Sequence, residues 1–445
     1  MKTRKMMAMR TLLLCAAVVS SCTSALAEDA WKTTEMAAAK ASKAAHYIEA
    51  EKLLSENLKL AQSFGPKDPR LPRTMLDLAE IYRAEGKYAQ ALNTYDQALQ
   101  IYNKIYGPDA TEVADSLEGE GEAYKSLNDF GHAEPLLSQA LAIRERQLHA
   151  GDPDIAQSQN DLGELYTLTG SFEKAEPLLI EARAARQKSP GAESAEFAQT
   201  EQALGTLYAR SGRSKQAEEA FRQAVGIFGK TVGGEHPDYA NALENLALSY
   251  SARKDFANAE PLLQRVLEIR QSVFGQEHRD VAASLDNLAA LKRAEQEPDD
   301  AANFYVQAIK IWEKVLGPDS SDLAVDLNNL GTIYAFSKEK NRAEPLFLRA
   351  AALDEKALGP ESPELGTDLN NLGLLYFFEK RYAEADKVYV RALSIRRKAL
   401  GERDSAVAET MSSYALVLQA LHRGAEAAQM QAQAKAILGN ANGSR

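Results

Sequence analysis

The chain has 445 residues, of which 45% are hydrophobic, and its formal net charge is −11 at neutral pH. This composition excludes a disordered polar chain, and the negative charge disfavours nucleic-acid phosphates and anionic lipid headgroups as partners. Both cysteines, Cys15 and Cys22, fall within the first 27 residues, so the rest of the chain has no thiol for a disulfide bond, a metal site or nucleophilic catalysis.

Residues 1–27 have the pattern of a secretory signal peptide. A basic stretch over residues 2–10 precedes an apolar stretch, Leu12–Val19, which is far below the roughly 20 residues that span a bilayer. Ala25-Leu26-Ala27 then forms a small-x-small cleavage site. The pattern predicts an exported protein, periplasmic or secreted, that is not an integral membrane protein.

A second interpretation of the same segment stays open. Val19-Ser20-Ser21-Cys22 resembles the bacterial lipobox, in which the cysteine is lipidated and becomes the new N-terminus. The resemblance implies that Cys22 would anchor the chain as an outer-membrane lipoprotein, since Thr23 gives no inner-membrane retention signal. This lipid anchor is the one membrane contact that the sequence predicts.

The rest of the chain repeats with a period of 42 residues. An alanine recurs at this spacing, at Ala91, Ala133, Ala175, Ala217, Ala259, Ala301, Ala343, Ala385 and Ala427. A fixed period of this length indicates a stack of similar supersecondary units, which bury their apolar faces against each other. Function is therefore expected on an extended surface rather than in a compact catalytic pocket.

Each unit is predicted to be a pair of helices. In the first helix a leucine is followed by a small residue and, three residues later, by a tyrosine, as in Leu162, Gly163 and Tyr166. All three lie on one helical face, where the small residue allows a neighbouring helix to approach closely. A turn residue such as Gly170, which tolerates a left-handed backbone, precedes the second helix, which carries the repeated alanine.

These columns resemble the tetratricopeptide repeat. L-G-x-x-Y followed by A-E-P-L-L and a closing L-G-P is similar to that family's pattern, and the 42-residue spacing with N-N-L-G at 328–331 and 370–373 resembles the kinesin light chain variety. The resemblance implies an all-α, right-handed superhelical solenoid over residues 28–438. It would contain about ten helix pairs, with an irregular first pair and a last pair that caps the stack. Residues 439–445 are expected to form a flexible tail.

In tetratricopeptide arrays the first helices line a concave groove, so the resemblance directs attention to the exposed columns of those helices. One column is the asparagine ladder, which consists of Asn245, Asn287, Asn329 and Asn371. A side-chain amide both donates and accepts hydrogen bonds, so the ladder can pair with the backbone of an extended partner segment whatever its sequence. The alternative is that each asparagine bonds a neighbouring helix or loop.

The predicted groove changes from acidic to apolar along the chain. Its N-terminal half has the acidic ladder, Glu80, Glu122 and Glu164, and its C-terminal half has the aromatic cluster, Phe336, Phe377 and Phe378. We therefore expect a protein or peptide partner with a basic segment at the N-terminal half and an apolar anchor near residues 330–380. The alternative is a solvated helix face and ordinary core phenylalanines.

The sequence predicts a protein-binding scaffold and no enzyme. It has no phosphate-binding loop, nucleophile elbow or zinc-protease motif, and His236 and His278, one repeat step apart, are expected to be loop residues rather than joint metal ligands. No catalytic residue, metal or cofactor is therefore expected. Two other functions stay open: a lipid-anchored envelope assembly factor that uses the convex face, and a glycan-binding module that uses the aromatic cluster and the tyrosines.

Overall fold

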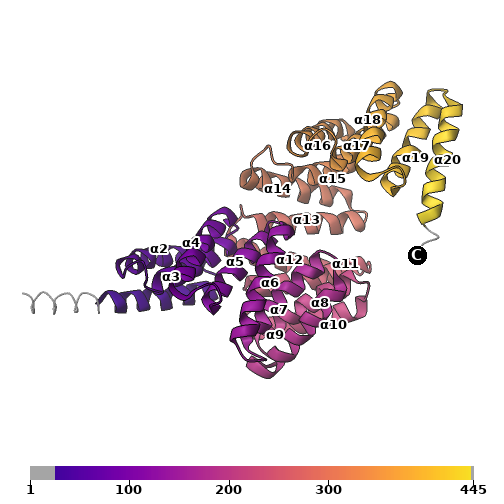
Figure 1. Cartoon of the computed structure of the whole chain (residues 1–445). Coiled ribbons are helices and arrows are strands. Elements are labelled where there is room, and N and C mark those ends of the chain that lie inside the picture. The colour runs from indigo at the N-terminus through magenta and orange to yellow at the C-terminus, as the bar shows by residue number, and fades with distance from the viewer. Residues whose placement is uncertain (1–25, 442–445) are drawn as a thin grey trace, which may run out of the picture. The chain divides into compact units, whose positions relative to one another are not determined.

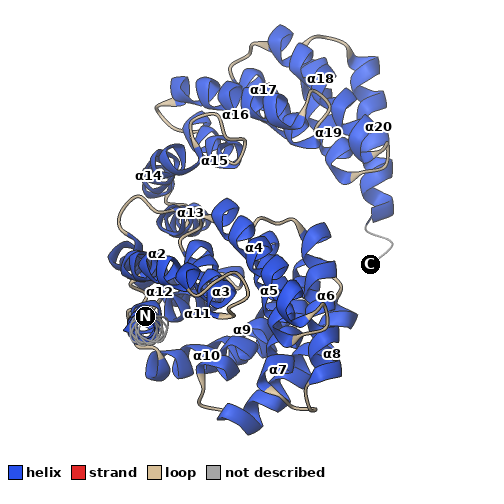
Figure 2. Cartoon of the chain, turned by 60° about the vertical axis from the view of Figure 1, so that its left-hand side comes forward, coloured by secondary structure: helices blue, strands red, loops and turns tan. Residues whose placement is uncertain are grey.

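The computed structural model describes residues 26–441, and all regular secondary structure in that range is helical (Figures 1 and 2). The predicted all-α solenoid of helix pairs is therefore confirmed. The chain divides into two compact units, unit 1 (Met1–Phe274) and unit 2 (Gly275–Arg445). The predicted signal peptide, apart from its last two residues, and the predicted lipidation of Cys22 lie outside the described residues.

Helices that follow each other in the chain pack together in pairs within each unit. The helices of unit 1 are a first helix over residues 26–43, α2 (Tyr47–Ser63), α3 (Arg70–Ala84), α4 (Tyr88–Tyr106), α5 (Thr111–Ser126), α6 (Phe130–Gln147), α7 (Pro153–Leu168), α8 (Phe172–Arg186) with the short π-helix η1 (Gln187–Gly191), α9 (Ala195–Arg210), α10 (Ser214–Thr231), α11 (Pro237–Ala252) and α12 (Phe256–Phe274). The helices of unit 2 are α13 (Arg279–Ala294), α14 (Pro298–Leu316), α15 (Leu323–Ala335), the short 3-10 helix η2 (Lys340–Arg342), α16 (Ala343–Leu358), α17 (Pro363–Phe378), α18 (Tyr382–Leu400), α19 (Ser405–Ala420) and α20 (Gly424–Ala441). Helix α20 thus continues to Ala441, although the tail was expected to begin at residue 439.

The two small-residue columns form the core of each pair. The repeated alanine of the second helix is buried throughout, and Ala91, Ala217 and Ala343 have no exposed surface. The small residue of the first helix faces a large side chain of the second, so a Cβ atom built on Gly205 would lie only 2.5 Å from the Phe221 ring. Close packing of the helix pair therefore explains why both columns hold small residues.

A left-handed residue makes the turn inside most pairs, as predicted, whereas α15 and α16 are joined through η2 without one. At Gly170 φ is +76°, and at Lys254, two repeats further on, φ is +61°. In both turns the next residue donates its N–H back to the carbonyl of the recurring tyrosine, from Ser171 to Tyr166 at 2.8 Å and from Asp255 to Tyr250 at 2.9 Å. The turn is the same with and without glycine, so the packing of the pair imposes it.

Side chains cap the first helices where the chain enters them. The ring Nδ1 atoms of His236 and His278 accept hydrogen bonds from the backbone N–H groups of Asp238 and Asp280, each at 3.2 Å. Such bonds satisfy backbone donors that a helix start leaves free. These two histidines are thus loop residues with a capping role.

Candidate functional site

Unit 1 curves back on itself, so that helices far apart in the sequence meet. The rings of Tyr47 in α2 and Phe274 in α12 are stacked with their centroids 5.9 Å apart. Arg83 in α3 also lies close enough to Asp238 in α11 to act on its pKa. Helices α3, α5, α7 and α11 therefore share an inner face, and this face contains the acidic ladder.

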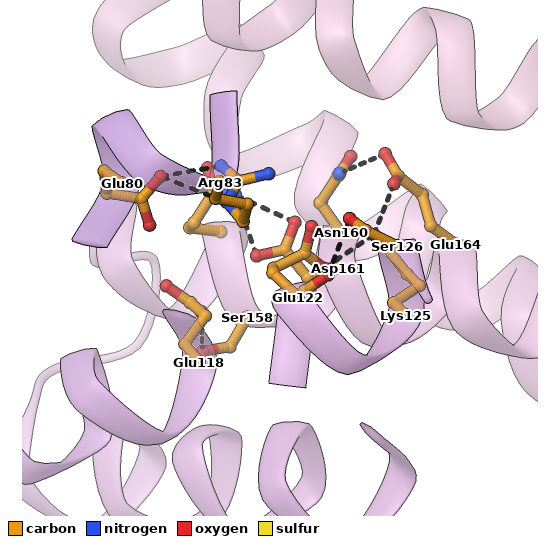
Figure 3. Close-up of polar contacts among 11 residues, drawn as sticks. Glu80, Arg83, Glu118, Glu122, Lys125, Ser126, Ser158, Asn160, Asp161 and Glu164 are labelled. Atoms are coloured by element: carbon orange, nitrogen blue, oxygen red, sulfur yellow. Dashed lines mark hydrogen bonds and ion pairs between the residues drawn. The ribbon is translucent and has the colours of Figure 1, made fainter. Parts of the chain in front are cut away.

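Each glutamate of the acidic ladder already has a basic partner from the chain (Figure 3). Glu80 accepts from Arg83 at 2.7 Å and from the hydroxyl of Tyr95 at 2.5 Å. Lys125 lies 2.6 Å from Glu122 in its own helix and 2.8 Å from Glu164 in the next repeat. The ladder is therefore an internal ion-pair network rather than a row of free carboxylates.

The sequence analysis missed the two cations, although each stands three residues after a glutamate, a spacing that pairs side chains on a helix. Their effect is visible in the pKa values of the ladder. Burial acts to raise the pKa of Glu80 and Glu164, but Arg83 and Lys125 together with hydrogen bonds lower both below the usual value. For Glu122 burial dominates over Lys125 and raises the pKa to about 7.

Two hollows open on the first helices beside the acidic ladder. One, of about 570 Å³, lies between the helix over residues 26–43 and α3, and its lining includes Glu35, Asp77 and Glu80 over an apolar floor. Lys43 and Arg73 also line this hollow. The Nε of Arg73 lies 3.9 Å from Glu35 and 3.7 Å from Asp77, too far for hydrogen bonds. Burial raises the pKa of Asp77 to about 6 against the effect of Arg73. This hollow therefore presents carboxylates that a further cation would stabilise.

The second hollow, of about 180 Å³, lies between α7 and α9. It is lined by Glu164, Thr167, Leu168, Gln202, Ala203 and Thr206. The sequence analysis did not identify these neighbours, because they become adjacent only when successive repeats stack.

The asparagine ladder is half-buried and only partly engaged. Asn329 accepts from Arg293 at 2.8 Å, and Asn371 donates to Asn328 at 3.2 Å. In the part of the chain that the structure describes, the Nδ2 of Asn329, the Oδ1 of Asn371 and the whole amide of Asn245 make no hydrogen bond, whereas Asn287 is already engaged. The ladder thus combines structural bonds with unused donors and acceptors.

The aromatic cluster lies at the turns between the first and second helices of unit 2. Phe336 and Phe378, which are 66% and 55% exposed, meet edge to face with centroids 5.4 Å apart. Phe377 contacts Phe378 at 5.7 Å and Tyr382 at 5.9 Å. Phe336 and Phe378 are therefore surface residues, not core residues.

A second exposed apolar column lies on the second helices of unit 2. Val306, Leu348 and Val390 are 42 residues apart and 42%, 47% and 53% exposed. Exposed apolar residues that line up along a repeat stack are candidates for contact with another molecule. We call these three residues the outer column.

Buried arginines of the second helices form a set of polar contacts that the sequence analysis missed. Arg144, Arg186 and Arg396 occupy one column of the 42-residue period, and each is at most 5% exposed. Each donates to a backbone carbonyl ten residues further on and to a hydroxyl fourteen residues further on, as Arg396 does to Ala406 (2.9 Å) and Thr410 (2.7 Å). The serine or threonine at this offset was the available sequence signal. We call this contact the arginine corner.

The described residues lack two kinds of site, a metal-binding cluster and a membrane-spanning helix. Residues 26–441 contain no group of three or more histidine, aspartate or glutamate side chains that could hold a metal ion. None of the helices in this range combines the length and apolar character required to cross a bilayer.

Comparisons with known proteins agree with the geometry. The family model of the tetratricopeptide repeat matches residues 30–104, 71–146, 154–230, 227–272, 238–314, 280–356 and 365–439. No curated protein sequence matches the chain.

Several solved structures have similar folds. BtubC (BKLC) from P. vanneervenii is 24% identical over 52% of this chain and 92% of its own, with a TM-score of 0.45. A putative kinesin light chain from Podosopora anserina, with nearly identical repeats, is 27% identical over 47% of this chain and 97% of its own, with a TM-score of 0.36. A Rap protein complexed with Competence and Sporulation Factor is 13% identical over 85% of this chain and 100% of its own, with a TM-score of 0.53.

Proposed function

The chain belongs to the tetratricopeptide repeat family, and we propose that it is an exported scaffold that binds an extended segment of a partner protein along its first helices. Within each unit, stacked repeats give such a scaffold an extended binding surface. The export part of the proposal rests on the signal-peptide pattern of residues 1–27.

The unused amide groups of the asparagine ladder carry the proposal. Asn329 and Asn371 are held in place by one bond each, which leaves one polar group of each amide for a partner. An extended peptide has a backbone donor and acceptor at every non-proline residue, so it can pair with such amides without a particular sequence. The solved Rap protein is a complex with Competence and Sporulation Factor, which supports partner binding by this fold.

A basic residue of the partner would enter the hollow beside Glu80 rather than pair along the whole acidic ladder. Glu122 and Glu164 are already paired with Lys125. Asp77 and Glu35 make no ion pair shorter than 3.7 Å with the described residues, although Lys43 also lines the hollow, so a partner cation gains more there. The apolar end of the partner would contact Phe336 and Phe378.

The test is a crosslinked pull-down from the cell envelope with native protein and two triple variants. One variant carries Asn245→Ala, Asn329→Ala and Asn371→Ala, and the matched control carries Val306→Ser, Leu348→Ser and Val390→Ser in the outer column. We expect the asparagine variant to lose the partner while it keeps the native circular dichroism, and the control to retain it. Equal capture by all three proteins would rule out the first helices as the binding site.

The outer column favours a second candidate function. Val306, Leu348 and Val390 offer an apolar stripe on the second helices, which suits an envelope assembly factor that uses this face and is anchored through Cys22. In that case the control variant loses the partner, and Cys22→Ala releases the protein from the membrane fraction. A glycan-binding module has less support, because the rings of Phe336 and Phe378 are inclined by 72° and offer no common flat platform.

A further inference from the structure

One junction of unit 2 has two aspartates where other junctions have an arginine corner. Asp354 of α16 stands one period before Arg396, and Asp368 of α17 stands one period before Thr410. Both are buried, with 5% and 1% of their surfaces exposed. Two carboxyl groups in contact cannot both be ionised at low cost, so they hold together when one carries a proton and donates it to the other.

The hydrogen bonds of Asp368 are consistent with a shared proton. Its Oδ1 accepts from the amide of Asn328 in α15 at 2.5 Å. Its Oδ2 is buried and has no hydrogen-bond donor among the described residues. A proton between Asp354 and Asp368 would satisfy this oxygen.

The charged groups around the pair do not offer a cation. The groups that act on it are Glu364 of α17 and Asp322 before α15, and both are acidic. Of the arginines on the adjoining α18, Arg396 donates to Thr367 and Thr410, and Arg391 donates to Glu355. Among the described residues no cation forms an ion pair with Asp354 or Asp368, so a proton is left to neutralise the pair.

The junction between α14 and α15 in unit 2 also lacks both the arginine and the hydroxyl residue of an arginine corner. Trp312 of α14 replaces the arginine and donates its Nε1–H to Asp286 of α13 at 2.8 Å. Asp326 of α15 replaces the hydroxyl residue, is 8% exposed, and makes no hydrogen bond or ion pair with the described residues. The charged groups nearby are Asp286 itself and Arg293 of α13, which is bonded to Asn329.

We propose that these two junctions of unit 2 are proton-controlled: they are closed while their carboxyl groups hold protons and loosen when the protons are lost. The Asp354–Asp368 pair is the main element, because it joins the second helix of one repeat to the first helix of the next. Loosening it changes how α17 packs on α16. The device is a property of the fold and does not depend on the proposed partner.

The direction in which pH changes the stability of the junction follows from the raised pKa values of its aspartates. Burial is the main cause that raises the pKa of Asp368, from 3.8 to about 7, and it also raises the pKa of Asp354. The folded state therefore keeps a proton that the unfolded state has lost above about pH 4. The stabilisation from this proton is lost as the pH rises through about 7, so the junction is tighter in mild acid.

The experiment is amide hydrogen exchange of α17 in the full chain at pH 6 and pH 8, corrected for the intrinsic exchange rate. For a group whose pKa rises from 3.8 to about 7, linkage predicts that the opening equilibrium increases about tenfold between these pH values. Asp368→Asn, which does not titrate and can donate to Asp354, should largely remove this increase. The double variant Asp354→Arg, Asp368→Thr, which recreates the arginine corner, should also be independent of pH.

Asp319→Asn is the matched control, since it removes an exposed carboxylate of the same unit. In this variant the opening equilibrium of α17 should increase about tenfold between pH 6 and pH 8, as in the native chain. A native chain without a change between pH 6 and pH 8, or an Asp368→Asn variant that keeps the full change, would overturn the proposal. If Asp368→Asn prevents folding, the double variant decides the question alone.

Discussion

Units 1 and 2 repeat the same helix pair but neutralise buried charge in different ways. In unit 1, the buried Arg144 lies 2.5 Å from the mostly buried carboxylate of Glu118 and 2.7 Å from that of Asp115, which is 45% exposed. In unit 2, Trp312 and Asp354 stand in the same column, and the carboxyl groups beside them have no cation. The repeat therefore fixes where a polar junction residue lies, while each junction has its own chemistry.

The difference has a consequence for stability. An arginine keeps its charge at every pH that a protein experiences, so its bonds to the carbonyl and hydroxyl groups of an arginine corner do not depend on its own titration. Nearby carboxyl groups still respond to burial, which together with Asp161 raises the pKa of Glu118 to about 8 against the effect of Arg144. A carboxyl corner depends on protons that leave near neutral pH.

Removal of Arg144 should cause the largest loss of stability. Arg144→Met leaves Glu118, whose side chain is only 14% exposed, without its cation, and breaking such a buried pair costs about 3–5 kcal/mol. Asp115 should add little, because its side chain is 45% exposed and solvent screens it. The free energy of unfolding from urea titration checks this value. The matched control is Arg146→Ala, two residues further on, whose pair with Asp109 is more than half exposed and should contribute almost nothing.

Arg396→Met in unit 2 tests how much stability is lost when the arginine has only neutral hydrogen-bond partners. Arg396 donates to Thr367, to Thr410 and to the carbonyl of Ala406, which are all neutral groups. Its removal should cost less than removal of Arg144, about 1–3 kcal/mol, because it leaves unsatisfied dipoles rather than charges. Equal losses at both positions would contradict the contrast between ionic and neutral corners.

Replacement of Asp326 should stabilise the chain, but only at high pH. Burial raises the pKa of Asp326 to about 7, so the folded chain binds a proton there that the unfolded chain releases near pH 4. Asp326→Ser, which imitates Ser158 at the equivalent position, removes this cost. We expect a gain on the order of 2 kcal/mol at pH 8 that shrinks toward pH 5, measured by urea unfolding at several pH values. A gain that does not depend on pH would show that Asp326 is not protonated in the fold.

The period of 42 residues was sufficient to predict the helix pairs, the buried alanine column and the left-handed turns, because these features depend on spacing and residue size. The ladder residues could also be located, since a column on a helix face follows from the register. The pairing of Lys125 with Glu164 could not be predicted, because it joins neighbouring repeats through side-chain reach. The arginine corner was missed for another reason: its residues stand fourteen positions apart in different helices, and half of its partners are backbone groups.

The small-residue column should tolerate a methyl group poorly in both units. A Cβ atom on Gly205 would lie 2.5 Å from Phe221, so Gly205→Ala forces the two helices of the pair apart. Overpacking costs about 1–3 kcal/mol, and the better helix propensity of alanine returns nearly 1 kcal/mol of this, which leaves a net loss of about 1 kcal/mol. Gly226→Ala in α10, where the new methyl group meets open space, is the control and should stabilise the chain slightly.

The smallest effect is expected where ion pairs cross between repeats on the surface. Lys356 lies 2.9 Å from Asp319, and the two side chains are 67% and 75% exposed. Lys398 and Glu361 form the equivalent pair one repeat later. Because solvent screens such pairs and ordering two long side chains costs entropy, Lys356→Ala should leave the thermal midpoint unchanged at physiological salt.

The thermal midpoints of the native chain and of Lys356→Ala should be compared at low and high salt, because salt screens an exposed ion pair. The hydrogen bond from Lys356 lowers the pKa of Asp319, so the pair does interact, but an interaction in water need not stabilise the fold. If Lys356→Ala lowered the midpoint as much as Arg144→Met does, the repeats would be held together mainly from the outside. The contrast between the buried junctions of the two units would then have little weight in the stability of the chain.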